Sequence, residues 1–199
     1  IPFVKAEREH GSLMARSLLS LAPDAEIWDL PLIPRQIDNV SSFTLGAAFA
    51  YLIVRFVTHF IPGPWVIVNA WGIDSRFDEA IWGDYSNNKN HPLNVQIGLA
   101  GQEHDIVFAA GNSGQFCPDP QAGPYDRGPG RSIFGANGHA DVTSVGAVRT
   151  DAIWIGASSQ GPGPSELAGD DCGDNEKPDF CAPGWFLEDR DSALRNGGT

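Results

Sequence analysis

Two short apolar runs that each end in glycine constrain the fold of this chain more than any other feature. VIVNAW occupies residues 66–71 before Gly72, and DIVFAA occupies residues 105–110 before Gly111. Both runs are apolar almost without alternation, which is typical of strands that are buried on both faces. Residues 93–101 between them have a helical composition. The sequence therefore predicts an α/β domain with a mostly parallel sheet covered by helices.

Further elements are expected on both sides of these strands. Residues 11–22 have apolar positions at helical spacing and stop at Pro23, which places His10 at the start of the helix. Ser41 and Ser42 can cap a helix over residues 43–60. Strands are expected at residues 25–30, 141–148 and 178–184, and the segment 114–138, rich in Gly, Pro and Asp, is expected to be a long ordered loop.

Charge and apolar content exclude two classes of partner. The chain has 25 acidic and 13 basic residues, a net charge of −12, and no cluster of Lys or Arg. We therefore expect no nucleic acid and no anionic membrane as partner. The most apolar stretch, residues 43–71, carries Arg55 and His59 and is broken by Pro62-Gly63-Pro64. Neither piece is expected to reach the roughly 20 residues that span a bilayer, so we interpret the stretch as a buried helix and a buried strand.

The cysteines and histidines predict no metal centre and no cofactor. Three cysteines form no C-x-x-C pair, so at most one disulfide bond can form. Cys181 is expected to be a buried, unreactive thiol and Cys117 an accessible one, while no role is predicted for Cys172. His59, His91, His104 and His139 lack metal-ligand spacing and are expected to be surface or capping residues. The acidic segment 165–176 is expected to be a solvated loop, with structural calcium as the alternative.

The ends of the two apolar strands hold the candidate chemistry. In open α/β sheets, functional residues gather beyond the carboxyl ends of the strands. Asn112 follows the glycine of the second strand in the sequence AAGNSG, and its neutral amide could donate to a developing oxyanion. Taken singly, Asn112 also fits an ordinary turn, and His10 also fits a surface or capping position.

The order of the motifs changes that interpretation. HGSLMARSLLSLAPDAEI, WVIVNAWG, DIVFAAGNSG, DVTSVGAV, ASSQGPG, KPDFCAPG and the final GGT follow one another along the chain. In this order they resemble the successive motifs of the subtilisin-like serine protease family. His10-Gly11-Ser12 corresponds to the H-G-T motif of the catalytic histidine, with Ser in place of Thr. The resemblance implies a three-layer, doubly wound domain with a mostly parallel central sheet covered by helices.

The resemblance also implies an activity and a set of site residues. It predicts a serine endopeptidase that forms an acyl-enzyme with an Asp-His-Ser triad and an Asn oxyanion hole, acts on polypeptides without a cofactor, and is secreted or extracellular. His10 would be the catalytic base and Asn112 the oxyanion donor. The residues implied to flank the pocket for the substrate side chain before the scissile bond are Ala70, Trp71, Gly72, Ala109, Ala110 and Gly111.

Two members of the triad are expected outside this sequence. Gly198 and Thr199 match the first two letters of the G-T-S nucleophile motif, and the triad aspartate would lie on a strand before residue 1. Residues 1–199 are therefore expected to form a partial peptidase domain that is inactive alone. Three alternatives remain: a catalytically dead peptide-binding module, a transpeptidase or macrocyclase of the same family, and a doubly wound small-molecule-binding domain. The last is disfavoured because no G-x-G-x-x-G motif is present.

Overall fold

Four parallel strands form the central sheet of the protein. The computed structural model describes residues 2–30, 40–73, 75–77, 79, 84–169, 175–184, 186–187 and 195–196. The sheet has the order β1-β2-β3-β4, with every neighbouring pair parallel. Its strands are β1 (Val66–Asn69), β2 (Asp105–Ala109), β3 (Thr143–Val148) and β4 (Phe180–Pro183). A short antiparallel pair, β5 (Phe186–Leu187) and β6 (Arg195–Asn196), is separate from it. The predicted parallel sheet is thus confirmed.

The pairing register brings the carboxyl ends of β1 and β2 to the same edge of the sheet. Val66 lies opposite Asp105, and Asn69 lies opposite Phe108. Val107 lies opposite Thr143 on the next strand. The residues that follow β1 and those that follow β2 are therefore neighbours in space, as the sequence predicts.

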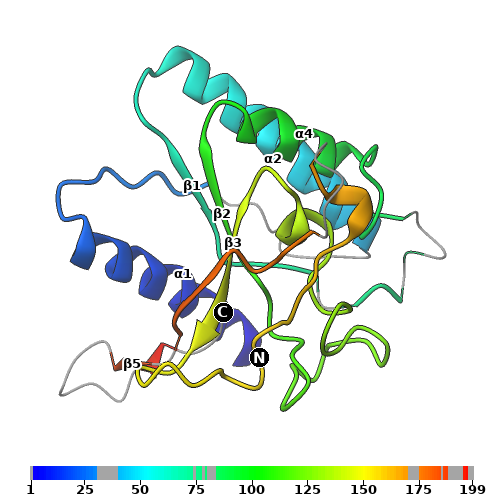
Figure 1. Ribbon diagram of the computed structural model, residues 1–199. Coiled ribbons are helices and arrows are strands. Elements are labelled where there is room, and N and C mark those ends of the chain that lie inside the picture. The colour runs from blue at the N-terminus through cyan, green and yellow to red at the C-terminus, as the bar shows by residue number, and fades with distance from the viewer. Residues whose placement is uncertain are drawn as a thin grey trace.

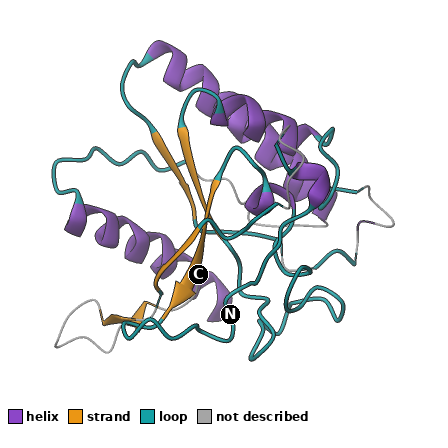
Figure 2. Cartoon of the chain, in the orientation of Figure 1, coloured by secondary structure: helices purple, strands orange, loops and turns teal. Residues whose placement is uncertain are grey.

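Helices flank the sheet. The long ones are α1 (Pro2–Leu21), α2 (Val40–Phe60) and α4 (Pro92–Gly101), and two 3-10 turns are η1 (Gly135–Gly138) and η2 (Ser165–Leu167). Figure 1 shows α2 and α4 side by side, with α1 on the other side of the strands. Loops occupy much of the chain between β2 and β3 (Figure 2), in agreement with the long loop expected at residues 114–138.

The core lies between the α2–α4 pair and the first two strands. Its buried members come from both helices and from β2, and burial of each large apolar side chain contributes about 1.5–3 kcal/mol. They include Ala47, Tyr51, Leu93, Ile97, Ala100, Ile106 and Phe108. Helix α4 begins sharply because Pro92 occupies its first turn and the His91 side chain accepts a hydrogen bond from the backbone N–H of Leu93.

Two expectations about the amino-terminal part of the chain are wrong. His10 lies inside α1, which already begins at Pro2, because the preceding residues 6–9, Ala-Glu-Arg-Glu, are strong helix formers. Residues 25–30 have no strand structure and are exposed. No described strand pairs with them, and a strand needs a paired neighbour to satisfy its backbone N–H and C=O groups.

Cys181 is exposed. The prediction of a buried thiol, made from its apolar neighbours in the sequence, is therefore wrong. It lies on β4, which is an edge strand of the described sheet, and the adjacent Phe180 is 54% exposed. Cys117 is exposed as predicted, and Cys172 lies outside the described residues. Phe180 and Cys181 are therefore apolar residues of β4 that no described part of the chain buries.

Helix α2 is longer than the sequence indicates. It spans 21 residues, and Ser41–Phe60 is long and apolar enough to cross a membrane by length and composition. The expectation that neither apolar piece reaches that length is wrong, because the helix begins at Val40. A core helix passes the same test, and α2 buries Ala47 and Tyr51 in the core while Arg55 donates to Gln96 Oε1 on α4 at 3.2 Å. The length of α2 is thus weak evidence for a membrane.

Candidate functional site

A cavity of about 210 Å³ lies at the carboxyl ends of β1 and β2. It brings together every site residue named from the sequence: the histidine of α1, the residues that follow β1 and those at the end of β2. Its lining consists of His10, Ala70, Trp71, Gly72, Ile73, Ala109, Ala110, Gly111, Asn112, Ser113, Ser132, Phe134 and Asn137. His10 thus shares one small space with residues about 60 and 100 positions later in the chain.

The backbone on both sides of Asn112 is fixed by contacts with Ser159. Gly111 has φ +109°, and a Cβ there would lie 2.9 Å from Ser159 Oγ, so glycine is required on two grounds. Ser159 accepts from the backbone N–H of Ser113 at 3.0 Å, and its own N–H donates to Gly111 O at 2.9 Å. Asp119 N donates to Asn112 O at 2.8 Å. The turn that carries Asn112 is therefore held from several directions.

The end of β1 is organised by Asn69. Its Oδ1 accepts from Tyr51 Oη at 3.0 Å and from Trp71 Nε1 at 3.2 Å, and its Nδ2 donates to Val107 O on β2 at 3.2 Å. Burial holds the pKa of Tyr51 well above its usual value, so the phenol remains a donor. Asn69 thus ties helix α2 and strand β2 to the segment that enters the cavity.

The ring of Trp71 faces the core as well as the cavity. It makes edge contacts with Phe43 and Phe108, each with ring centroids 5.2 Å apart. Its indole N–H donates a hydrogen bond to Asn69 Oδ1. Trp71 therefore supplies a firmly packed wall of the cavity rather than a mobile side chain.

Asn137 closes the gap between the two strand ends. The residue is 4% exposed, and its Nδ2 donates to Trp71 O at 3.1 Å and to Ala109 O at 2.7 Å. A Cβ on Gly72 would lie only 3.0 Å from that Nδ2. The absence of a side chain at Gly72 therefore lets the Asn137 amide approach the strand ends.

The turn that carries Asn137 rests on Tyr85. Ala136 N donates to Tyr85 Oη at 2.8 Å, and Gly135 N donates to Ser86 O at 2.8 Å. Gly135 has φ +59°, and a Cβ at this position would overlap the Tyr85 ring. Tyr85 is 1% exposed, so this support is rigid.

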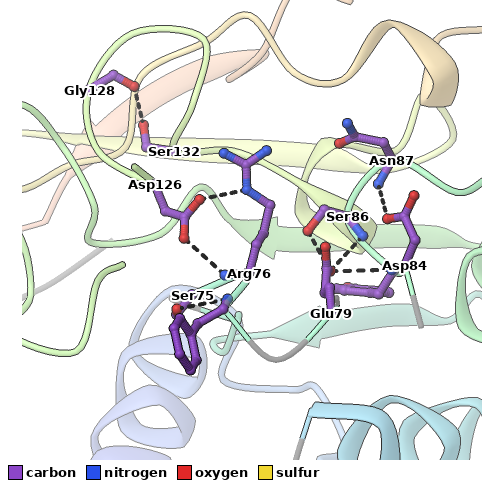
Figure 3. Close-up of polar contacts among 11 residues, drawn as sticks. Ser75, Arg76, Glu79, Asp84, Ser86, Asn87, Asp126, Gly128 and Ser132 are labelled. Carbon is purple, nitrogen blue, oxygen red and sulfur yellow. Dashed lines mark hydrogen bonds and ion pairs between the residues drawn. The ribbon is translucent and has the colours of Figure 1, made fainter. Parts of the chain in front are cut away.

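Glu79 organises the segment beneath that turn. One of its carboxylate oxygens accepts from Ser86 Oγ at 2.6 Å, from Ser86 N at 2.8 Å and from Tyr85 N at 3.2 Å. Figure 3 shows the Glu79 and Ser86 side chains pointing toward each other. Burial raises the pKa of Glu79, against the effect of its hydrogen bonds with Ser86 and Tyr85.

An ion pair supports the outer part of the cavity wall. Arg76 Nε contacts Asp126 Oδ1 at 2.6 Å, and Arg76 N donates to Asp126 Oδ2 at 2.9 Å, as Figure 3 shows. The guanidinium lies 5.3 Å from the centroid of the Phe134 ring, which lines the cavity. Ser132 Oγ donates to Gly128 O at 2.8 Å. The wall thus rests on a hydrogen bond within the long loop and on the ion pair that joins this loop to Arg76.

Sequence reasoning missed several lining residues. Ser113 adjoins Asn112 and Ile73 follows Gly72, so both could have been found by extending the two motifs. Ser132, Phe134 and Asn137 come from the Gly/Pro-rich loop, where no periodicity or motif distinguishes one residue from the next. Their roles depend on contacts with distant strands, which no local pattern reports.

The cavity combines a half-buried histidine, an asparagine amide on a fixed turn, and strand ends built from small residues. Such a set can supply a general base, a neutral donor for a negative oxygen, and room for one side chain with an extended backbone. Within the described residues, no group of three or more His, Cys, Asp or Glu side chains could hold a metal ion. Gly198 and Thr199, and part of the acidic segment 165–176, lie outside the described residues. No protein-family model and no curated protein matches the chain.

Proposed function

We propose that this chain belongs to a subtilisin-like serine endopeptidase domain, three-layered and doubly wound. His10 would act as the general base, Asn112 would donate to the oxyanion, and the strand ends would bind the substrate backbone. The observation that carries the proposal is that the candidate site residues meet in space. Residues chosen from separate motifs of the sequence all line one cavity, at the carboxyl edge of parallel strands where such sites form.

The construction of the turn at Asn112 gives further support. An oxyanion donor is effective when its position is fixed before the reaction begins, because no energy is then spent on reorganisation in the transition state. The hydrogen bonds between Ser159 and the residues beside Asn112 provide that fixation. A residue that served only to reverse the chain direction would need no such support from a distant loop.

The proposal requires an aspartate to orient His10 and a serine nucleophile, and the resemblance assigns both to positions outside residues 1–199. The test therefore uses the natural protein that carries this chain. Asn112→Leu should lower kcat by about 10²–10³-fold with little change in KM, a magnitude that belongs to subtilisin and is carried over with the resemblance. Asn90→Leu, the same change at an exposed position, is the matched control and should leave kcat unchanged.

Other outcomes would identify the alternatives. If Asn112→Leu only lowers the melting temperature and the folded fraction keeps its kcat, Asn112 is a turn residue and the proposed mechanism is wrong. If the natural protein binds peptides but is not labelled by a fluorophosphonate probe, it is a peptide-binding module. If added amines capture the acyl group in preference to water, it is a transpeptidase.

A further inference from the structure

The amide of Asn137 has one polar atom that the described part of the protein does not use. Both hydrogens of Nδ2 are directed at backbone carbonyls, those of Trp71 and Ala109. Since carbonyl oxygens can only accept, the nitrogen must face the strands and the orientation of the amide is fixed. No donor among the described residues reaches Oδ1, and this oxygen is not fully buried. It is therefore an acceptor open to the cavity that Asn137 lines.

The position of this oxygen is as firmly determined as that of a core atom. Asn137 is 4% exposed, and its turn is held by Tyr85 Oη through Ala136 N. Asn175 Nδ2 holds the other side of the turn by donating to Gly138 O at 2.7 Å. Oδ1 cannot turn away to water without breaking the bridge between the two strand ends. A ligand that fills the cavity must therefore either donate to this oxygen or leave it desolvated.

The charges around the cavity further restrict the kind of hydrogen-bond donor that a ligand can bring to Oδ1. Among the lining residues, only His10 can carry a positive charge, and the nearby Arg76 is paired with Asp126. The whole chain has a net charge of −12. A carboxylate in the cavity would meet an acceptor oxygen and a negative protein, so neutral or cationic donors are favoured.

We propose that Asn137 is a specificity-determining residue whose Oδ1 selects substrates carrying a hydrogen-bond donor on the side chain that enters this cavity. This class includes the phenol of tyrosine and the amide of glutamine, which have apolar counterparts of similar size in phenylalanine and methionine. The proposal rests on the proposed peptidase function, which assigns the cavity to the residue before the scissile bond. A site built to bind a donor discriminates against a twin lacking it, because the acceptor is left unpaired and buried.

The experiment compares substrates that differ only in the donor. The natural protein that carries this chain is assayed with succinyl-Ala-Ala-Pro-X p-nitroanilides, in which X is tyrosine or phenylalanine in one pair and glutamine or methionine in the other. In at least one pair, the donor-bearing substrate should have a kcat/KM higher by about 10- to 100-fold. Asn137→Leu should bring that ratio close to one. A merely structural role for Asn137 would lower both members of a pair equally and leave the ratio unchanged.

The variant could fail to fold because the strand bridge is lost, so a second variant accompanies it. Asn137→Ala removes Oδ1 as Asn137→Leu does, but it places no larger apolar group between the strand ends. If neither pair is discriminated by the natural protein, or if the discrimination persists in a folded variant, the specificity proposal is overturned. If no substrate is hydrolysed and no fluorophosphonate labelling occurs, the peptidase function has failed instead. Calorimetric titration with acetyl-Ala-Ala-Pro-X amides, in which X forms the same two pairs, then tests the cavity alone, and equal affinities within both pairs would overturn the proposal.

Discussion

The hydroxyl oxygen of Ser159 lies 3.0 Å from the backbone nitrogen of Ser113 and accepts its hydrogen bond. This contact joins the loop after β3 to the turn that carries Asn112. Both serines are buried, with 2% of each exposed, so water cannot replace the bond. The geometry of the turn that carries the candidate oxyanion donor thus depends on a hydroxyl 46 residues after Ser113 in the chain.

Ser159→Ala should therefore destabilise the protein and also impair the site. The buried N–H of Ser113 would lose its acceptor, which costs about 1–3 kcal/mol in the free energy of unfolding. In the natural protein, the loosened turn should also lower kcat about tenfold if Asn112 contributes as proposed. Urea unfolding and steady-state kinetics on the same preparation measure the two effects.

Ser158→Ala is the matched control for that experiment. Ser158 is also buried, and its Oγ accepts from a backbone N–H, that of Ala147, at 2.9 Å. It should lose a similar amount of stability, but its partner lies within β3 and away from the cavity, so kcat should be retained. Equal effects of the two substitutions on kcat would show that the Ser159 contact has no special relation to the site.

The contacts of Ser159 also illustrate which parts of the site the sequence can predict. The strands, and the positions of Asn112 and Gly111, follow from apolar runs that end in glycine, which is a local signal. The bridge made by Asn137 spans 66 residues to Trp71 and 28 residues to Ala109, and no local pattern encodes it. Sequence reasoning therefore located the cavity but not the residue that closes it.

The errors of the sequence analysis have a related cause. Residues 25–30 have strand-like composition, but composition does not supply a strand that pairs with them, and none does so in the described structure. The same holds for Cys181, whose burial depends on what covers β4. For His10, the apolar spacing predicts a helix but places its start too late, because residues 6–9 extend the helix through their high helical propensity.

His91 makes the stability of the protein dependent on pH. Its Nδ1 accepts from the backbone N–H of Leu93 at 3.1 Å and caps α4, which only the neutral ring can do. Burial lowers the pKa of His91, against the effect of Asp84. A lowered folded-state pKa means that the unfolded chain binds the proton more readily. The contribution of His91 is thus complete above pH about 6.5, the unfolded value, and is lost as the pH falls through that value toward the folded-state pKa.

His91→Asn separates the cap from the titration. Asparagine is a good capping residue and does not ionise in this range, so the variant should keep most of the stability at pH 7.5. Between pH 7.5 and pH 5.5, the melting temperature of the wild type should fall relative to that of the variant. His91→Ala should cost about 1 kcal/mol at pH 7.5. Parallel melting curves for wild type and His91→Asn across this range would contradict the assignment.

The ion pair of Arg76 and Asp126 is expected to respond unequally to loss of either partner. The side chain of Arg76 is 31% exposed, whereas that of Asp126 is 7% exposed. Without Asp126, the guanidinium can turn to water. Without Arg76, the carboxylate remains buried with one backbone N–H as donor, and a buried charge without its partner is costly. Arg76→Met should therefore cost about 2–3 kcal/mol, reduced from the fully buried case by the partial exposure, and Asp126→Asn should cost less.

The double variant gives the sharper test, because it predicts a change of sign. Asp126→Asn introduced into Arg76→Met removes the stranded charge while keeping the size of the side chain and an oxygen that can accept from Arg76 N. The double variant should consequently be more stable than Arg76→Met alone, although each substitution by itself is destabilising. Urea unfolding of the four proteins at pH 7 and moderate salt measures this coupling. If the two losses simply add, Asp126 is well solvated after Arg76 is removed, and the wall of the cavity at Phe134 does not depend on a buried charge pair.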